Sequence, residues 1–186
     1  MKNMIHSGKS LSNVVSTLII LVVSVLLAGV VTMYAINITS TRTQQEALKL
    51  TKEAIWVYGN GTAFAGVVVD NVGGRDVVID KVQVRGVEAD WTKAYYLRLP
   101  LALSTSLNCP NGTIDWTNFP YTLGKVGNFT TDSYDKPLAS GDTIIIYIIN
   151  PESVSVSDIG VTIGVTVFTE NAQYYVECNV KSAEFA

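Results

Sequence analysis

Residues 14 to 36 read VVSTLIILVVSVLLAGVVTMYAI, and this stretch decides the architecture of the chain. As an α-helix it measures about 35 Å, which is enough to cross a bilayer. No charged residue occurs from Ser10 to Thr41. The stretch is too long for the central region of an ordinary secretory signal, and no small-x-small cleavage site follows it. We therefore expect a membrane helix that is retained.

Residues 41–58 continue with helix-forming residues and contain no Gly or Pro. Leu48, Ile55 and Tyr58 fall on one stripe at helical spacing, and Gly59-Asn60-Gly61 supplies a stop signal. The pattern predicts one helix over residues 11–58, apolar all round in its first half and amphipathic in its second. An ordinary single-pass anchor has no need of the second half.

The chain after Gly61 has β-strand preferences. Residues 103–138 lack periodicity and predict a long loop with one or two short strands. The segments rich in β-branched and aromatic residues, separated by turn residues, are 64–70, 76–87, 93–103, 143–150, 161–167 and 173–181. Strands at this spacing without a second helix predict an antiparallel, immunoglobulin-like β-sandwich over residues 62–186. The expected fold class is α+β, a long N-terminal hydrophobic α-helix followed by this sandwich.

The residue types of common catalytic and metal sites are scarce downstream of the helix. The only histidine is His6, so residues 62–186 hold no His-based triad, Cys–His pair or histidine metal site. Carboxylates such as Asp132 and Asp135 lack the spacing of a calcium loop and are expected to be solvated turn residues. We therefore expect no enzyme, no cofactor and no metal. The net charge of −3 and the lack of a basic stripe also argue against nucleic acid.

Cys109 and Cys178 are the two cysteines of the chain. Two sulfurs alone do not form a zinc site. If this part of the chain lies outside the cell, a disulfide is expected, closing a loop of about 70 residues and contributing about 4 kcal/mol. Two unrelated buried thiols are the alternative.

Asn-x-Ser/Thr sequons begin at Asn37, Asn60, Asn111 and Asn128. The last three fall in predicted turns, where an oligosaccharyltransferase has access, whereas Asn37 falls within the helix. Glycosylation is expected first at Asn111 and Asn128, then at Asn60, and not at Asn37.

The sequence Lys9-Ser10-Leu11-Ser12-Asn13, placed just before the apolar helix, resembles the class III signal peptide of archaeal type IV pilins. Residues 67–86 and 138–146 resemble the β domain of archaeal pilins and archaellins, so the likeness covers the whole chain. It implies that a prepilin peptidase reads Lys9, that Ser10 is the last residue removed, and that Leu11 begins the mature subunit. Two departures stand out: Ser10 replaces the commoner Gly or Ala, and the Glu near the mature start of bacterial pilins has no counterpart.

The resemblance also implies an assembly pathway. Residues 1–10 are a signal peptide that is removed, and Lys2 and Lys9 keep the head in the cytoplasm by the positive-inside rule. The helix over residues 11–58 lies in the membrane in the precursor and in the filament core after assembly, with the β domain at the cell surface. The residues expected to pack between helices in that core are Ser16, Leu18, Leu21, Ser24, Leu27, Ala28 and Gly29.

The expected function is a structural subunit of an extracellular archaeal type IV pilus that serves adhesion. Its expected partners are further copies of the chain, the prepilin peptidase, the assembly machinery in the membrane, and surfaces or other cells. An archaellin of a swimming filament and a minor pilin share the architecture. A different class of protein also remains open, namely a membrane-anchored surface binding domain that never polymerises.

Overall fold

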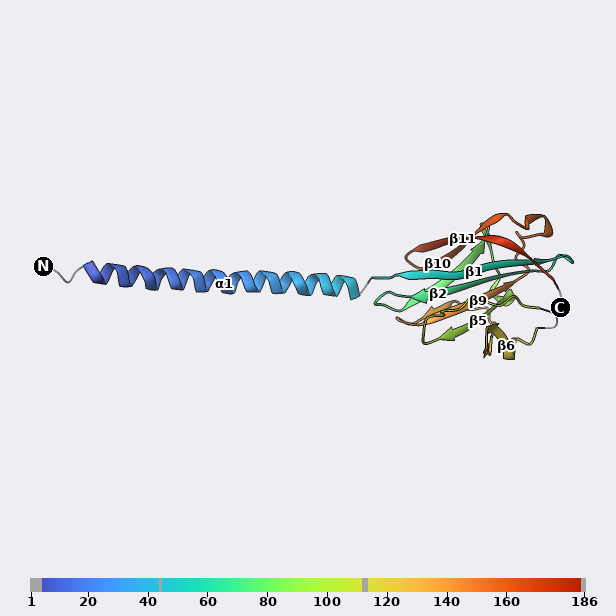
Figure 1. Ribbon diagram of the computed structural model, residues 1–186, viewed down its shortest axis with the longest axis horizontal. Coiled ribbons are helices and arrows are strands. Elements are labelled where there is room, and N and C mark those ends of the chain that lie inside the picture. The colour runs from blue at the N-terminus through green and yellow to red at the C-terminus, as the bar shows by residue number, and fades with distance from the viewer. Residues whose placement is uncertain (1–4, 44, 112–113, 185–186) are drawn as a thin grey trace. The chain divides into compact units, whose positions relative to one another are not determined.

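The computed structural model describes residues 5–43, 45–111 and 114–184. The chain forms two compact units, Met1–Gln44 and Gln45–Ala186. The first unit contains the helix α1 (Ile5–Thr43), and the second contains every strand (Figure 1). The expected fold class, an N-terminal apolar helix followed by a sandwich-like β domain, is confirmed.

The expected extension of the helix to Tyr58 is wrong, because α1 ends at Thr43 and residues Leu48–Tyr58 form the strand β1. The side chains of Ala54 to Tyr58 are all buried and point alternately into two different cores. A strand that is covered on both faces carries a continuous run of apolar residues, and β-branched and aromatic residues favour it. A bulge between Thr51 and Ala54, with Lys52 at φ 55°, disturbs the strand's alternation. As a result, the apolar residues of β1 recur in the sequence at intervals that resemble those of an amphipathic helix.

The strands of the second unit form one sheet in the order β4-β3-β10-β11-β1-β2-β9-β5, with β8 added beside β3. Neighbouring strands are antiparallel except for β1 and β11, which are parallel. The further strands are β2 (Ala63–Asn71), β3 (Val77–Val84), β4 (Val87–Glu88), β5 (Ala94–Leu99), β8 (Lys136–Leu138), β9 (Thr143–Ile149), β10 (Thr162–Thr169) and β11 (Gln173–Ala183). The β domain therefore begins before residue 62, since β1 lies in the middle of its sheet.

The inner core lies between the two halves of the sheet, which face each other. Ile55 and Val57 of β1, Ile146 of β9 and Val165 and Val167 of β10 all contribute to it and are buried. Every second residue of β10 enters this core, as the alternation of its sequence predicts. One continuous sheet thus supplies both layers of the sandwich.

An outer core covers the opposite face of β1, β2, β9 and β5. Trp56, Phe64 and Tyr147 form its floor on the strands, and Phe119 and Phe129 pack onto them from the segment between β5 and β8. That segment contains a short 3₁₀-helix (Trp116–Asn118) and the hairpin of β6 (Phe119–Thr122) and β7 (Lys125–Gly127). The predicted long loop is therefore an aromatic layer over one outer face of the sheet.

Residues 45–47, which precede β1, are held by two turns of the β domain. The backbone N–H of Val72 and that of Gly73 donate to the carbonyl of Ala47 over 2.9 and 3.0 Å. A Cβ at Gly73 would lie 2.6 Å from backbone atoms of Gln45 and Ala47, so glycine is required there. The hydroxyl of Thr169 donates to the carboxylate of Glu46. The first residues after the helix unit are thus part of the β domain.

Candidate functional site

The most unusual surface of the protein belongs to α1. Residues Leu11–Thr41 form a span long and apolar enough to cross a membrane, and none of its side chains is buried. The described Ser and Thr hydroxyls that donate to the carbonyl four residues earlier are those of Thr17, Ser24, Thr32, Thr39 and Thr41. Their polar hydrogens are therefore satisfied within the helix, and the surface offered to surroundings is almost wholly apolar.

The residues expected at the processing site lie near the start of α1. Leu11 is helical and 69% exposed. Lys9 and Ser10 lie in the helix as well, and their side chains fall outside the described part of the structure. The role of the three residues in signal processing stays a prediction.

The seven residues expected to pack between helices point in three directions around α1. Since eleven residues complete about three turns, Leu18 shares a direction with Gly29, and Ser16 shares one with Leu27. A third direction is formed by residues at spacings of three and four, namely Leu21, Ser24 and Ala28. Their packing against other helices stays a prediction.

The expected disulfide is wrong, since Cys109 and Cys178 are both free thiols. Cys178 lies on β11 and packs against the inner core, whereas Cys109 packs against the outer core. The sheet separates the two cores, and a disulfide requires Cβ atoms about 3.8 Å apart. The alternative reading of two unrelated, partly buried thiols is the one that holds.

Neither thiol is activated. Burial raises the pKa of Cys109, and it raises the pKa of Cys178 to about 11, with a smaller contribution from Glu53. The Sγ of Cys109 lies 3.2 Å from the hydroxyl of Tyr58, which donates to the carbonyl of Pro110 over 2.5 Å. Both cysteines are therefore protonated at neutral pH and are poor nucleophiles.

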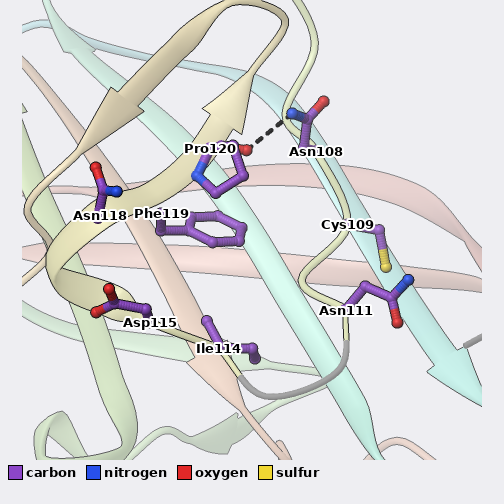
Figure 2. Close-up of a pocket in the computed structure, with 8 residues that line it drawn as sticks. All are labelled: Asn108, Cys109, Asn111, Ile114, Asp115, Asn118, Phe119 and Pro120. Atoms are coloured by element: carbon purple, nitrogen blue, oxygen red, sulfur yellow. Dashed lines mark hydrogen bonds between the residues drawn. The ribbon is translucent and has the colours of Figure 1, made fainter. Parts of the chain in front are cut away.

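Asn108 and Cys109 border the main hollow of the outer layer, which has a volume of about 540 Å³ (Figure 2). Its other lining residues are Asn111, Ile114, Asp115, Asn118, Phe119 and Pro120. The Asn108 side chain donates to the carbonyl of Pro120 over 2.8 Å, and Asp115 accepts from the backbone N–H of Thr117 over 3.1 Å. These side chains fold the loop, and they do not form a nucleophile–base pair.

The asparagines expected to carry glycans are all exposed. Asn60 lies in the turn after β1, where its side-chain oxygen accepts from Thr62 N over 2.9 Å. Asn128 follows β7, and Asn111 lies at the rim of the hollow. Thr113, the last residue of the Asn111 sequon, falls outside the described residues. Glycosylation at these three positions stays a prediction.

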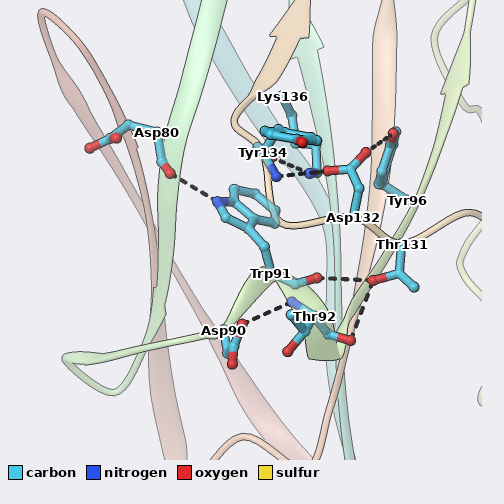
Figure 3. A network of polar contacts seen from close by, with 9 residues as sticks. All are labelled: Asp80, Asp90, Trp91, Thr92, Tyr96, Thr131, Asp132, Tyr134 and Lys136. Carbon is cyan, nitrogen blue, oxygen red and sulfur yellow. Dashed lines mark hydrogen bonds and ion pairs between the residues drawn. The ribbon is translucent and has the colours of Figure 1, made fainter.

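A buried lysine organises the other notable polar site (Figure 3). Lys136 is 0% exposed, and its ammonium forms an ion pair with Asp132 and donates to the Tyr134 carbonyl. The same nitrogen lies 4.6 Å from the ring centre of Trp91 and 4.7 Å from that of Tyr96. Two aromatic faces and one carboxylate thus replace the water that the cation loses on burial.

The Tyr96 hydroxyl completes this site by donating to Asp132 over 2.7 Å. The hydrogen bond from Lys136, and then that from Tyr96, lower the pKa of Asp132 to about 2. Asp132 is thus partly exposed, as expected of a turn residue, but it is also the ion-pair partner of a buried lysine, which the sequence did not predict. Sequence reasoning missed the site because Trp91 and Tyr96 lie about 40 residues before Lys136, and no motif links them.

Among residues 5–43, 45–111 and 114–184, no group of three or more His, Cys, Asp or Glu side chains is arranged to hold a metal ion.

No protein-family model matches the chain, and no curated protein sequence matches it. One solved structure with distant similarity is the copper-bound PCuAC domain from PmoF2, with 11% identity, a TM-score of 0.35, and coverage of 75% of this chain and 100% of that one. Another is the β-glucosidase from Listeria innocua in complex with glucose, with 12% identity, a TM-score of 0.25, and coverage of 74% and 16%. Likenesses at these TM-scores do not bear on function.

Proposed function

We propose that the chain is the structural subunit of an extracellular filament of the type IV pilin kind, and that it polymerises through α1. One observation carries the proposal: every described side chain of the apolar span Leu11–Thr41 is exposed. Such a surface requires lipid or other apolar helices around it.

The length of the apolar span favours helices as its final surroundings. Its 31 uncharged residues measure about 46 Å as a helix, and the more strongly apolar run within it, residues 14–36, measures about 35 Å. The hydrocarbon core of a bilayer is about 30 Å thick. A simple anchor needs about 20 residues. The residues beyond this number are not needed in an anchor, whereas in a bundle of helices they lengthen the contact between neighbours.

Gly29 supports the same proposal. A glycine in a helix interior costs about 1 kcal/mol relative to alanine. A Cβ at Gly29 would meet no atom of the described residues within 4 Å, so no contact in that part of the chain requires glycine there. Close approach of a second helix would require it, as small residues at the contacts of membrane helices do.

The resemblance of residues 1–10 to a class III signal peptide suggests how the subunit reaches the filament. The precursor is held in the membrane by α1, with Lys2 and Lys9 on the cytoplasmic side and the β domain outside. A prepilin peptidase removes residues 1–10, the assembly machinery extracts the subunit, and identical subunits stack head to tail in an open helix. The β domains coat the filament and serve attachment to surfaces or other cells. The chain acts by binding and assembly rather than as an enzyme.

Two other functions share parts of this support. An archaellin of a swimming filament or a minor pilin uses the same helix. Deletion of the gene separates a pilin from an archaellin, because loss of attachment indicates a pilin and loss of motility indicates an archaellin. A membrane-anchored surface domain that never polymerises accounts for α1 as well. The amphipathic extension to Tyr58, which sequence reasoning held against this alternative, is absent, so the length of the span and Gly29 now carry the distinction.

The test is to shear cells that express the chain and to examine the released material. Electron microscopy of this fraction is expected to reveal filaments, and mass spectrometry is expected to find a chain that begins at Leu11. A full-length chain retained in the membrane fraction, without filaments, would support the non-polymerising anchor instead.

A further inference from the structure

The two outer faces of the sheet differ. The aromatic layer covers the face formed by β1, β2, β9 and β5, whereas the outer side chains of β3, β10 and β11 are exposed or half-exposed. On β11 the outward residues are Gln173, Tyr175, Glu177, Asn179 and Lys181, which alternate with inward ones. We call the outward surface of β4, β3, β10 and β11 the open face. Tyr175, on this face, is 62% exposed.

Tyr175 lies flat on the open face. A Cβ built at Gly164, on the neighbouring strand, would lie 2.3 Å from Cε2 and 2.5 Å from the hydroxyl oxygen of Tyr175. The ring therefore covers the glycine backbone, and any side chain at Gly164 would displace it. The Tyr175 hydroxyl donates to Glu177 over 2.7 Å, which fixes the direction of the ring. With one side against the sheet, and 62% of the residue exposed, the other side of the ring faces solvent.

A row of polar side chains crosses the strands from the backbone position of Tyr175, whose partner on β10 lies two residues from Gly164, which the ring covers. The strand register pairs Tyr175 with Thr166, Thr166 with Gln83, and Gln83 with Glu88. At about 4.8 Å between strands, the row spans about 14 Å. The side chains of Thr166 and Gln83 make no hydrogen bond within the described part of the chain, so their donors and acceptors are available. The row thus combines one aromatic platform with hydroxyl, carboxamide and carboxylate groups.

The charges of the open face nearly balance. Lys81 lies 3.9 Å from Glu88 and 5.2 Å from the ring centre of Phe168. Lys181 and Glu177 also point outward from β11. Asp80 of β3 is exposed as well, so these strands carry three carboxylates and two ammonium groups, and the small excess of negative charge gives no reason to expect an anionic partner.

We propose that the open face binds a neutral saccharide chain, with one sugar ring stacked on Tyr175 and the next hydroxyl groups bonded to Thr166, Gln83 and Glu88. A sugar ring offers a C–H face to an aromatic ring and hydroxyl groups at its rim, which matches this arrangement. A protein partner of standard size would need about 800 Å² with an apolar centre, and the open face offers two aromatic rings among polar groups. The proposal names the class of ligand through which the proposed filament would attach to surfaces, and in that respect it rests on the proposed function. Saccharide binding by a single subunit does not require polymerisation, so it can be tested separately.

The test is isothermal titration calorimetry of the full chain in detergent micelles with maltohexaose, cellohexaose and chitohexaose as separate probes. At least one probe is expected to bind. Tyr175→Ala is expected to weaken that binding about tenfold, which corresponds to the loss of one aromatic stacking contact. Tyr175→Phe keeps the ring and is expected to stay within about threefold of the parent chain.

Tyr134→Ala is the matched control, because this residue is 76% exposed and lies outside the strands of the open face, in the segment before β8. It is expected to leave binding unchanged. Gln83→Ala, on β3, provides a second variant that does not alter the packing on Gly164, and it is expected to weaken binding several-fold. Circular dichroism confirms that each variant is folded.

Failure of all three probes to bind the parent chain would overturn the proposal. Equal affinity of the parent chain, Tyr175→Ala and Gln83→Ala would overturn it as well. Neither result affects filament assembly, which microscopy of sheared material tests separately.

Discussion

At the scale of single residues, the most constrained group in the β domain is the Lys136 ammonium. It has no contact with water and depends on Asp132, Trp91 and Tyr96 for its stabilisation. A buried ion pair contributes little net stability when intact, and removal of one partner is costly because the other charge remains buried. The carboxylate of Asp132 is partly exposed, so the lysine is the partner that cannot be solvated.

Asp132→Asn is therefore expected to lower the free energy of unfolding by about 3 kcal/mol. Urea denaturation of the full chain in micelles, followed by tryptophan fluorescence, measures this, because all three tryptophans lie in the β domain. Lys93→Met is the control. It breaks the exposed pair with Glu152 and is expected to cost less than about 1 kcal/mol. Equal effects of the two substitutions would contradict the role given to Lys136.

The same site predicts a pH dependence. The folded pKa of Asp132 is about 2, below the unfolded value of about 3.9. A lowered folded pKa means that the ionised carboxylate stabilises the fold fully above about pH 4, and that this contribution is lost as the pH falls through about 2. The stability difference between the parent chain and Asp132→Asn is expected to narrow between pH 5 and pH 2. A difference that stays constant over this range in urea titrations would rule out the assignment.

At the scale of elements, α1 and β1 illustrate what a sequence pattern can predict. The apolar run of residues 14–36 predicts its helix because length and hydrophobicity are local properties. Residues 48–58 contain helix formers with apolar residues at helical spacing, yet they form β1, since burial on both faces by β2, β11 and the aromatic layer overrides local propensity. Strand partners far apart in the sequence decide this outcome, so the pattern of one segment cannot reveal it.

Gly29 provides the prediction at this scale. Gly29→Leu is expected to strengthen the isolated helix by about 1 kcal/mol and to abolish or greatly reduce filaments, because its side chain blocks close approach of a neighbouring helix. Negative-stain microscopy of sheared material, with immunoblotting of the membrane fraction, measures both assembly and expression. Val30→Leu is the control, because it enlarges an exposed apolar residue about 100° around the same helix from Gly29, and it is expected to leave filaments intact. Normal filaments from Gly29→Leu would contradict a close helix contact at Gly29.

At the scale of the whole molecule, composition and strand patterning predicted the α+β class and most strands. They did not predict that one sheet forms both layers, nor that the segment between β5 and β8 covers one outer face. The same limitation explains the cysteines. Their separation in sequence permits a disulfide, but the sheet places them in different cores, and only the three-dimensional arrangement reveals this.

The absence of a disulfide has a direct consequence for the stability of the β domain. The midpoint of thermal unfolding is expected to be unchanged by a reductant such as dithiothreitol. The intact mass after alkylation under denaturing, non-reducing conditions is expected to include two alkyl groups. A drop of several degrees on reduction, or a chain that takes up no alkyl group, would contradict the placement of Cys109 and Cys178 on opposite faces.

The central claim is that an exposed apolar helix becomes the core of a filament after its head is removed. Mass spectrometry of the N-terminus of filaments sheared from cells tests this claim most directly. The account predicts a mature chain that begins at Leu11, in material that microscopy identifies as filaments. A chain that still carries Met1 to Ser10, found in the membrane fraction with no filaments released, would contradict it.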